Sequence, residues 1–140
     1  MRPPDHRPAA GYRSATDAPP VVVVVEDDPA MRHSLKFLLE VEGYVVSTHN
    51  SRPSSALDEA LAGAACVIVD DTPPGTSGLD VLDGLRRRGC RLPAILIASH
   101  PDERKLSRAM ASGAFVVEKP LLDDVLHRAL EGAIAGGPVD

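Results

Sequence analysis

Residues 21–28 read VVVVVEDD, an unbroken run of five valines that ends in three acidic residues. A continuous β-branched run of this length is typical of a strand that is buried on both faces. Strands of that kind belong to parallel sheets that helices cover on both sides. The run therefore predicts the first strand of an α/β domain, with carboxylates at its carboxyl end.

Four further apolar runs follow, and a segment with the apolar spacing of a helix comes after each run. The predicted strands are residues 21–25, 44–48, 65–69, 94–98 and 115–117. The predicted helices are residues 29–42, 53–62, 79–88, 102–112 and 121–135. Strict alternation of strands and helices predicts a doubly wound five-stranded parallel sheet with right-handed crossovers.

Helical periodicity also predicts which side chains face the core. It places Leu106, Ala109 and Met110 inward on the helix at 102–112, and Leu122 inward on the last helix. Aromatic residues make up only 3% of the 140-residue chain, so we expect an aliphatic core.

Composition divides the chain into one domain and two short ends. Residues 1–20 hold five of the thirteen prolines without hydrophobic periodicity, which predicts a flexible tail. The domain is expected to span residues 21–135, with a C-terminal tail at 136–140. The net charge of −5 argues against a nucleic-acid-binding surface built from basic residues.

Neither a membrane segment nor a secretory signal is evident in the sequence. No apolar run approaches the roughly 20 residues that span a bilayer, and residues 1–20 lack the apolar region of a signal peptide. The two cysteines, Cys66 and Cys90, have no metal-ligand spacing and do not resemble a disulfide framework. We therefore expect a cytoplasmic protein.

Acidic residues gather where two of the predicted strands end. Glu26 and Asp27 follow the first strand, and Asp70 follows the strand at 65–69. The carboxyl ends of parallel strands meet at one edge of the sheet, where such folds bind ligands. Crowded carboxylates repel one another, and a hard cation such as Mg²⁺ relieves that repulsion. Lys119, at the end of the last strand, adds a charge that suits a phosphate.

Two other acidic residues have simpler interpretations. Asp28 precedes Pro29 at the start of a helix, where it is expected to be an N-cap. Asp71 is expected to be a surface residue.

Together these motifs resemble the receiver domain of two-component response regulators, over residues 21–135. The resemblance rests on VVVVVEDDPAMR at 21–32, VIVDDTPPGTSGLDVL at 67–82, LPAILIASH at 92–100 and VVEKP at 116–120. It implies a flavodoxin-like fold with the strand order 2-1-3-4-5.

The resemblance also implies a role for each residue at this edge. Asp70 would be the phospho-accepting aspartate. Glu26 and Asp27 would hold Mg²⁺ together with Asp70 and the backbone carbonyl of Thr72. Lys119 would contact the phosphoryl oxygens. Mg²⁺ and Lys119 would neutralise negative charge, so that the Asp70 carboxylate can approach the anionic phosphoryl group.

Further positions are assigned by the same resemblance. Pro120 would follow a cis peptide bond. His100 and Thr72 would control the access of water to the acyl phosphate and so its lifetime.

Two positions depart from the family pattern. Ala98 stands where the family has a threonine or serine, and Ser99 follows it. Val116 stands where the family has an aromatic residue, with Phe115 one position earlier. In the family these two positions couple phosphorylation to the protein surface, so the departures bear on the switch and not on the phosphotransfer chemistry.

A receiver of this kind would take its phosphoryl group from a sensor histidine kinase or a histidine phosphotransfer protein. No DNA-binding or catalytic segment is expected after residue 135, so a stand-alone response regulator is expected, acting through protein partners as a shuttle, sink or switch. Any enzymatic activity would be limited to self-phosphorylation and autodephosphorylation. The sequence does not decide whether two copies pair through the face formed by residues 102–112, 115–117 and 121–135.

One alternative function stays open, and three other classes of protein need motifs that the sequence lacks. The alternative is a degenerate receiver that binds proteins independently of phosphorylation. A haloacid-dehalogenase-type phosphatase needs an Asp-x-Asp motif on the first strand and a Toprim-type nuclease needs one later, and neither spacing is present. A nucleotide-binding module needs a glycine-rich first turn, which is absent after Val25.

Overall fold

Five parallel strands form one sheet, and the valine run lies next to its edge. The computed structural model of the chain describes residues 18–71, 77–122 and 124–140. The strands are β1 (Val21–Val25), β2 (Val45–His49), β3 (Cys66–Asp71), β4 (Ala94–Ala98) and β5 (Ala114–Glu118), in the order β2-β1-β3-β4-β5. This confirms the predicted α/β class, the flavodoxin-like architecture and the strand order.

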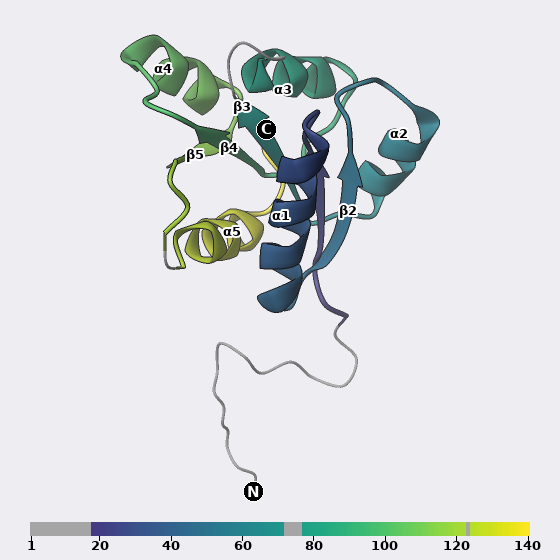
Figure 1. Cartoon of the computed structure of the whole chain (residues 1–140). Helices are drawn as coiled ribbons and strands as arrows, with labels where there is room; N and C mark the ends of the chain where they lie inside the picture. The colour runs from purple at the N-terminus through teal and green to yellow at the C-terminus, as the bar shows by residue number, and fades with distance from the viewer. Residues whose placement is uncertain (1–17, 72–76, 123) are drawn as a thin grey trace, which may run out of the picture.

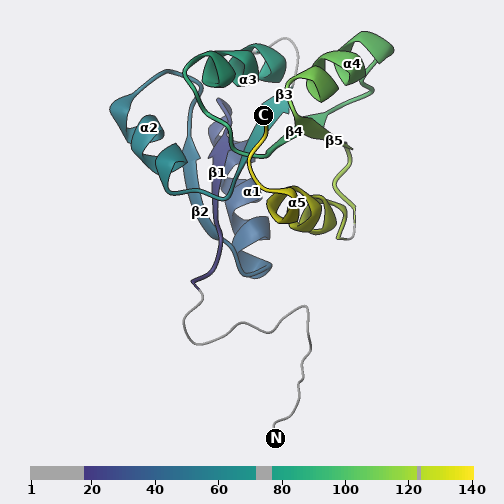
Figure 2. The ribbon, with the colours of Figure 1, turned by 180° about the vertical axis from the view of Figure 1, so that it is seen from behind.

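Helices cover both faces of this sheet (Figures 1 and 2). They are α1 (Pro29–Val41), α2 (Ser55–Ala62), α3 (Gly78–Arg87), α4 (Glu103–Ala111) and α5 (Val125–Gly136). One face packs against α1 and α5, and the other packs against α2, α3 and α4. Within the described residues, no helix is long and apolar enough to cross a membrane.

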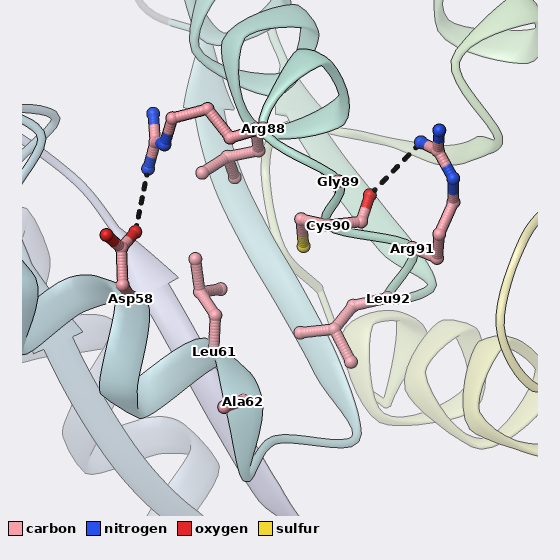
Figure 3. Close-up of a pocket in the computed structure, with 9 residues that line it drawn as sticks. Asp58, Leu61, Ala62, Arg88, Gly89, Cys90, Arg91 and Leu92 are labelled. Atoms are coloured by element: carbon pink, nitrogen blue, oxygen red, sulfur yellow. Dashed lines mark hydrogen bonds and ion pairs between the residues drawn. The ribbon is translucent and has the colours of Figure 1, made fainter.

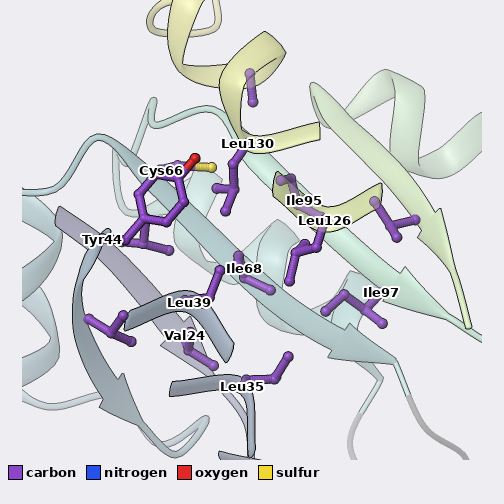
Figure 4. Packing of buried hydrophobic residues seen from close by; sticks show 14 residues of the cluster. Val24, Leu35, Leu39, Tyr44, Cys66, Ile68, Ile95, Ile97, Leu126 and Leu130 are labelled. Atoms are coloured by element: carbon purple, nitrogen blue, oxygen red, sulfur yellow. The ribbon is translucent and has the colours of Figure 1, made fainter. Parts of the chain in front are cut away.

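The core consists of two aliphatic layers, one on each side of the sheet. Alternate residues of β1 and β3 enter opposite layers, because successive side chains of a strand point to opposite faces. Figure 4 shows the layer under α1 and α5. Leu35 and Leu39 of α1, and Leu126 and Leu130 of α5, belong to the same buried cluster as Ile68 of β3. Each fully buried leucine or isoleucine contributes about 1.5–3 kcal/mol to folding.

Side-chain caps define where several of the helices begin. The Asp28 carboxylate accepts a hydrogen bond from the Ala30 N–H at 3.2 Å, so the predicted N-cap of α1 is confirmed. Asp102 caps α4 in the same way, accepting from the Lys105 N–H at 2.9 Å. These bonds satisfy amide groups that have no partner within the helix.

Three apolar side chains that the periodicity placed inward are exposed, so that prediction was wrong for them. Leu106 and Met110 of α4 are 42% and 78% exposed, while Ala109 is buried. The reason is that α4 packs on the edge strand β5 and on α3, which leaves a narrow contact stripe. Leu122 is 60% exposed because it precedes α5, in a turn whose Leu122 N–H donates to the Pro120 carbonyl.

Candidate functional site at the carboxyl edge of the sheet

An aspartate and a lysine from different strands meet at the carboxyl edge of the sheet. Asp70 lies in β3, and Lys119 directly follows β5. Lys119 Nζ is 2.9 Å from Asp70 Oδ1, and the Asp70 side chain is only 2% exposed. The Lys119 backbone N–H donates to the Ala98 carbonyl at 2.9 Å, which ties the end of β5 to β4. The Asp70 carboxylate is therefore a shielded anion with a cation in contact.

Glu26, at the end of β1, lies beside Asp70. Its backbone N–H donates to the His49 carbonyl at 2.9 Å, and the side chain is buried with the rest of the residue. Burial, followed by contact with the Asp70 carboxylate, raises the pKa of Glu26 to about 7, although the Asp28 N–H and Lys119 oppose this shift. The edge thus holds a carboxyl group whose negative charge is incompletely compensated.

The oxygens of Glu26 and Asp70 fit a hard divalent cation. Glu26 Oε2 accepts from the Asp28 N–H at 3.0 Å, whereas the buried Oε1 receives no hydrogen bond from a described residue. Mg²⁺ takes oxygen ligands, commonly one or two carboxylates with several waters. The uncompensated charge and the unsatisfied oxygen therefore suit such an ion.

Asp27, the other predicted metal ligand, contacts the segment after β2. Its two carboxylate oxygens accept hydrogen bonds from the Ser51 N–H at 2.7 Å and the Ser51 hydroxyl at 2.8 Å. Among the described residues, no three His, Cys, Asp or Glu side chains are grouped as a metal site. Thr72, the predicted carbonyl ligand, lies outside the described residues.

Asp71 is buried, so its interpretation as a surface residue was wrong. It is the last residue of β3 and only 2% exposed. Lys105 of α4 places its Nζ 2.6 Å from Asp71 Oδ2, and the Gly78 N–H donates to Asp71 Oδ1 at 2.9 Å. The physical reason is that β3 continues two residues beyond the predicted end, which carries Asp71 under α3 and α4. No local pattern in the sequence reveals Lys105 as its partner, 34 positions away.

The positions that depart from the family pattern differ in exposure. Ala98 is fully buried at the end of β4, and Ser99 is exposed beyond the strand. Val116 is half-buried on the same face of the sheet as Ala98, whereas Phe115 points to the other face and is 52% exposed. Ser99 and Phe115 therefore lie in different surroundings from Ala98 and Val116.

Two further predicted positions lie close to the same edge. The Lys119–Pro120 peptide bond is cis, as predicted. His100 follows β4 with an exposed side chain, and its Nδ1 lies 3.8 Å from Glu118 Oε2.

A pocket of about 560 Å³ lies away from these residues, at the opposite edge of the sheet (Figure 3). It opens between the end of α2 and the segment that enters β4, with an ion pair of 3.1 Å between Asp58 and Arg88 at its rim. Its lining shares no residue with the Asp70 site.

A family model and several known proteins are similar to this chain over most of its length. The family model described as "response regulator receiver domain" matches residues 22–131. The transcriptional regulatory protein FixJ of Azorhizobium caulinodans is 36% identical over 115 residues, which cover 81% of this chain and 54% of that protein. Nodulation protein W of Bradyrhizobium diazoefficiens is 34% identical, covering 92% and 57%. The chain thus spans about half the length of these relatives.

Solved structures agree with the sequence comparison. A response regulator receiver domain protein from Clostridium thermocellum superposes with a TM-score of 0.73 at 28% identity, covering 84% of this chain and 95% of that one. A chain from the complex of histidine kinase ThkA with response regulator TrrA gives a TM-score of 0.62 at 28% identity, covering 81% and 97%.

Proposed function

Because the chain belongs to the response regulator receiver domain family of two-component signalling, we propose that Asp70 accepts a phosphoryl group from a phosphohistidine. The observation that carries this proposal is the contact of 2.9 Å between Lys119 Nζ and Asp70 Oδ1 at the carboxyl edge. The donor is proposed to be a sensor histidine kinase or a histidine phosphotransfer protein. The likeness to a chain from a kinase–regulator complex supports a donor of this class.

The reaction is a displacement at phosphorus. A carboxylate oxygen of Asp70 attacks the phosphorus atom, forming an O–P bond as the P–N bond to the donor imidazole breaks. The bonding electrons return to the imidazole nitrogen, and the product on this chain is an acyl phosphate.

Charge neutralisation is the main task of the surrounding residues. Lys119 offsets the negative charge on Asp70 and on the incoming phosphoryl oxygens. Glu26, Asp27 and Asp70, with the carbonyl of Thr72, would hold Mg²⁺. The ion would supply further neutralisation of the phosphoryl oxygens when bound.

Other assignments extend this proposal. His100 and Thr72 would control the attack of water on the acyl phosphate. We assign the receiver to residues 21–135 and expect it to act in the cytoplasm, where it would meet the kinase domain. Because Ala98 and Val116 stand where the family has a hydroxyl and an aromatic residue, a phosphorylation-independent binding module is the alternative.

Intact-mass measurement after incubation with acetyl phosphate and Mg²⁺ tests the proposal. The wild-type chain is expected to gain one phosphoryl group, and the Asp70→Asn variant none. Asp58→Asn is the matched control, because Asp58 is exposed and pairs with Arg88 at the opposite edge. No gain in the wild type would favour the phosphorylation-independent module. Continuous phosphate release from simple monoesters would instead indicate a phosphatase.

A further inference from the structure

Helix α4 buries little apolar surface of its own and makes several polar contacts with the rest of the domain. Ala109 is its only buried residue among those described, and Leu106 and Met110 are exposed. Burial of apolar surface normally stabilises the packing of a helix on a sheet, so hydrophobic burial stabilises the position of α4 only weakly.

The C-terminal half of α4 is paired with α3. Arg108 Nη2 lies 2.6 Å from Asp80 Oδ1 and 2.7 Å from Asp83 Oδ2. The hydroxyl of Ser112, just after the helix, donates to Asp83 Oδ1 at 2.9 Å. All of these contacts join α4 to α3, and none of them reaches the sheet.

The N-terminal half of α4 is joined instead to the end of β3. Lys105 Nζ contacts Asp71 Oδ2 at 2.6 Å, and the Asp71 side chain is 3% exposed, whereas that of Lys105 is 33% exposed. The other oxygen of Asp71 accepts from the Gly78 N–H, at the start of α3. One buried carboxylate therefore links β3, α3 and α4.

Asp71 directly follows Asp70 in β3, so their side chains point to opposite faces of the sheet. The neighbouring strand offers no polar side chain there, because Asp71 pairs in register with Ala98. Among the described contacts, Asp71–Lys105 is the only side-chain ion pair or hydrogen bond between a strand and α4.

We propose that the Asp71–Lys105 ion pair couples phosphorylation of Asp70 to the position of α4. This inference rests on the function proposed above. Separating the pair would leave a buried carboxylate without its cation, which is strongly unfavourable. Moving α4 exposes little of the helix's own apolar surface, since Ala109 is its only buried residue. A shift of the backbone at residues 70 and 71 therefore carries Lys105 with it and moves the N-terminal half of α4.

Hydrogen–deuterium exchange of residues 103–111, with and without phosphorylation, measures this coupling. The variants are Lys105→Met and the double variant Asp71→Asn/Lys105→Met, which avoids a buried unpaired charge. Arg108→Met is the matched control, because it removes a cation from the same helix but leaves the link to β3. Intact mass measures phosphorylation in each sample, and a thermal melt checks folding.

In the wild type and in Arg108→Met, phosphorylation is expected to change exchange in α4 by threefold or more. In both Lys105 variants, phosphoryl uptake is expected to remain within about twofold of wild type, while the change in α4 is lost. The same α4 change in the phosphorylated double variant, or no change in the phosphorylated wild type, would overturn the coupling. Failure of the wild type to take up phosphoryl would overturn the proposed function, and the coupling with it.

Discussion

Lys119 reaches past β4 to place its Nζ 2.9 Å from Asp70 Oδ1 on β3. The two residues are 49 positions apart in the sequence, and they meet because β3, β4 and β5 are parallel neighbours whose carboxyl ends coincide. This contact gives the site both its nucleophile and a cation that can stabilise incoming negative charge.

Removing the Lys119 ammonium should slow phosphoryl uptake. In Lys119→Met, the rate of mass gain with acetyl phosphate is expected to fall about 100-fold, since one preorganised charge contact is typically worth a factor of 10²–10³. Lys36→Met is the control, because Lys36 is exposed on α1 and pairs with Glu40. An unchanged rate in Lys119→Met would contradict the role given to this lysine.

Glu26 should make stability depend on pH when no metal is present. Its pKa of about 7 in the folded chain lies above its ordinary value of 4.5. Between these two values the folded state binds more protons than the unfolded state, so stability falls as pH rises. The decrease expected from pH 5 to pH 8 is about 1–3 kcal/mol.

Urea unfolding at both pH values, in the presence of a chelator, measures this effect. Glu26→Gln cannot ionise and should lose this part of the decrease, whereas Glu40→Gln, on the exposed side of α1, should keep it. An identical pH profile for wild type and Glu26→Gln would show that Glu26 does not carry the effect.

Gly78 at the start of α3 should tolerate no side chain. A Cβ atom there would lie 2.9 Å from both the Asp70 carbonyl oxygen and Leu96 Cδ1. Gly78→Ala is therefore expected to destabilise the fold by about 1–3 kcal/mol through overpacking. It should also slow phosphoryl uptake, because the Asp70 backbone must shift.

Gly84→Ala is the matched control on the same helix. Its Cβ would meet only Arg87 Nη2, at 3.8 Å, so the change should stabilise the protein by about 0.5–1 kcal/mol through helix propensity. Thermal or urea unfolding compares the two variants. Equal stability of both variants would refute the close approach of α3 to Asp70.

Local sequence patterns predicted most of the fold. The five valines of β1 and the apolar run of β4 predicted their strands with the observed bounds, because buried strands need continuous β-branched or aliphatic residues. Periodicity failed on α4, where Leu106 and Met110 are exposed. A helix at the margin of a sheet buries a narrower stripe than its pattern of apolar residues suggests.

At the site, too, local patterns predicted some of the neighbouring residues and missed others. Charged residues at strand ends, combined with the rule that parallel strands end at one edge, predicted that Glu26, Asp70 and Lys119 would be neighbours. The burial of Asp71 and its pairing with Lys105 were not predictable, because β3 continues two residues beyond its predicted end and the partner lies 34 positions away.

The sequence by itself therefore determined the alternating α/β architecture and the edge at which its carboxylates and lysine gather, since both follow from local periodicity and the geometry of parallel sheets. Only the tertiary structure decided that Asp27 bonds to Ser51, that Phe115 faces away from Ala98, and that Lys105 of α4 pairs with Asp71. Those contacts join residues far apart in the chain, and their partners are selected by packing of the whole domain.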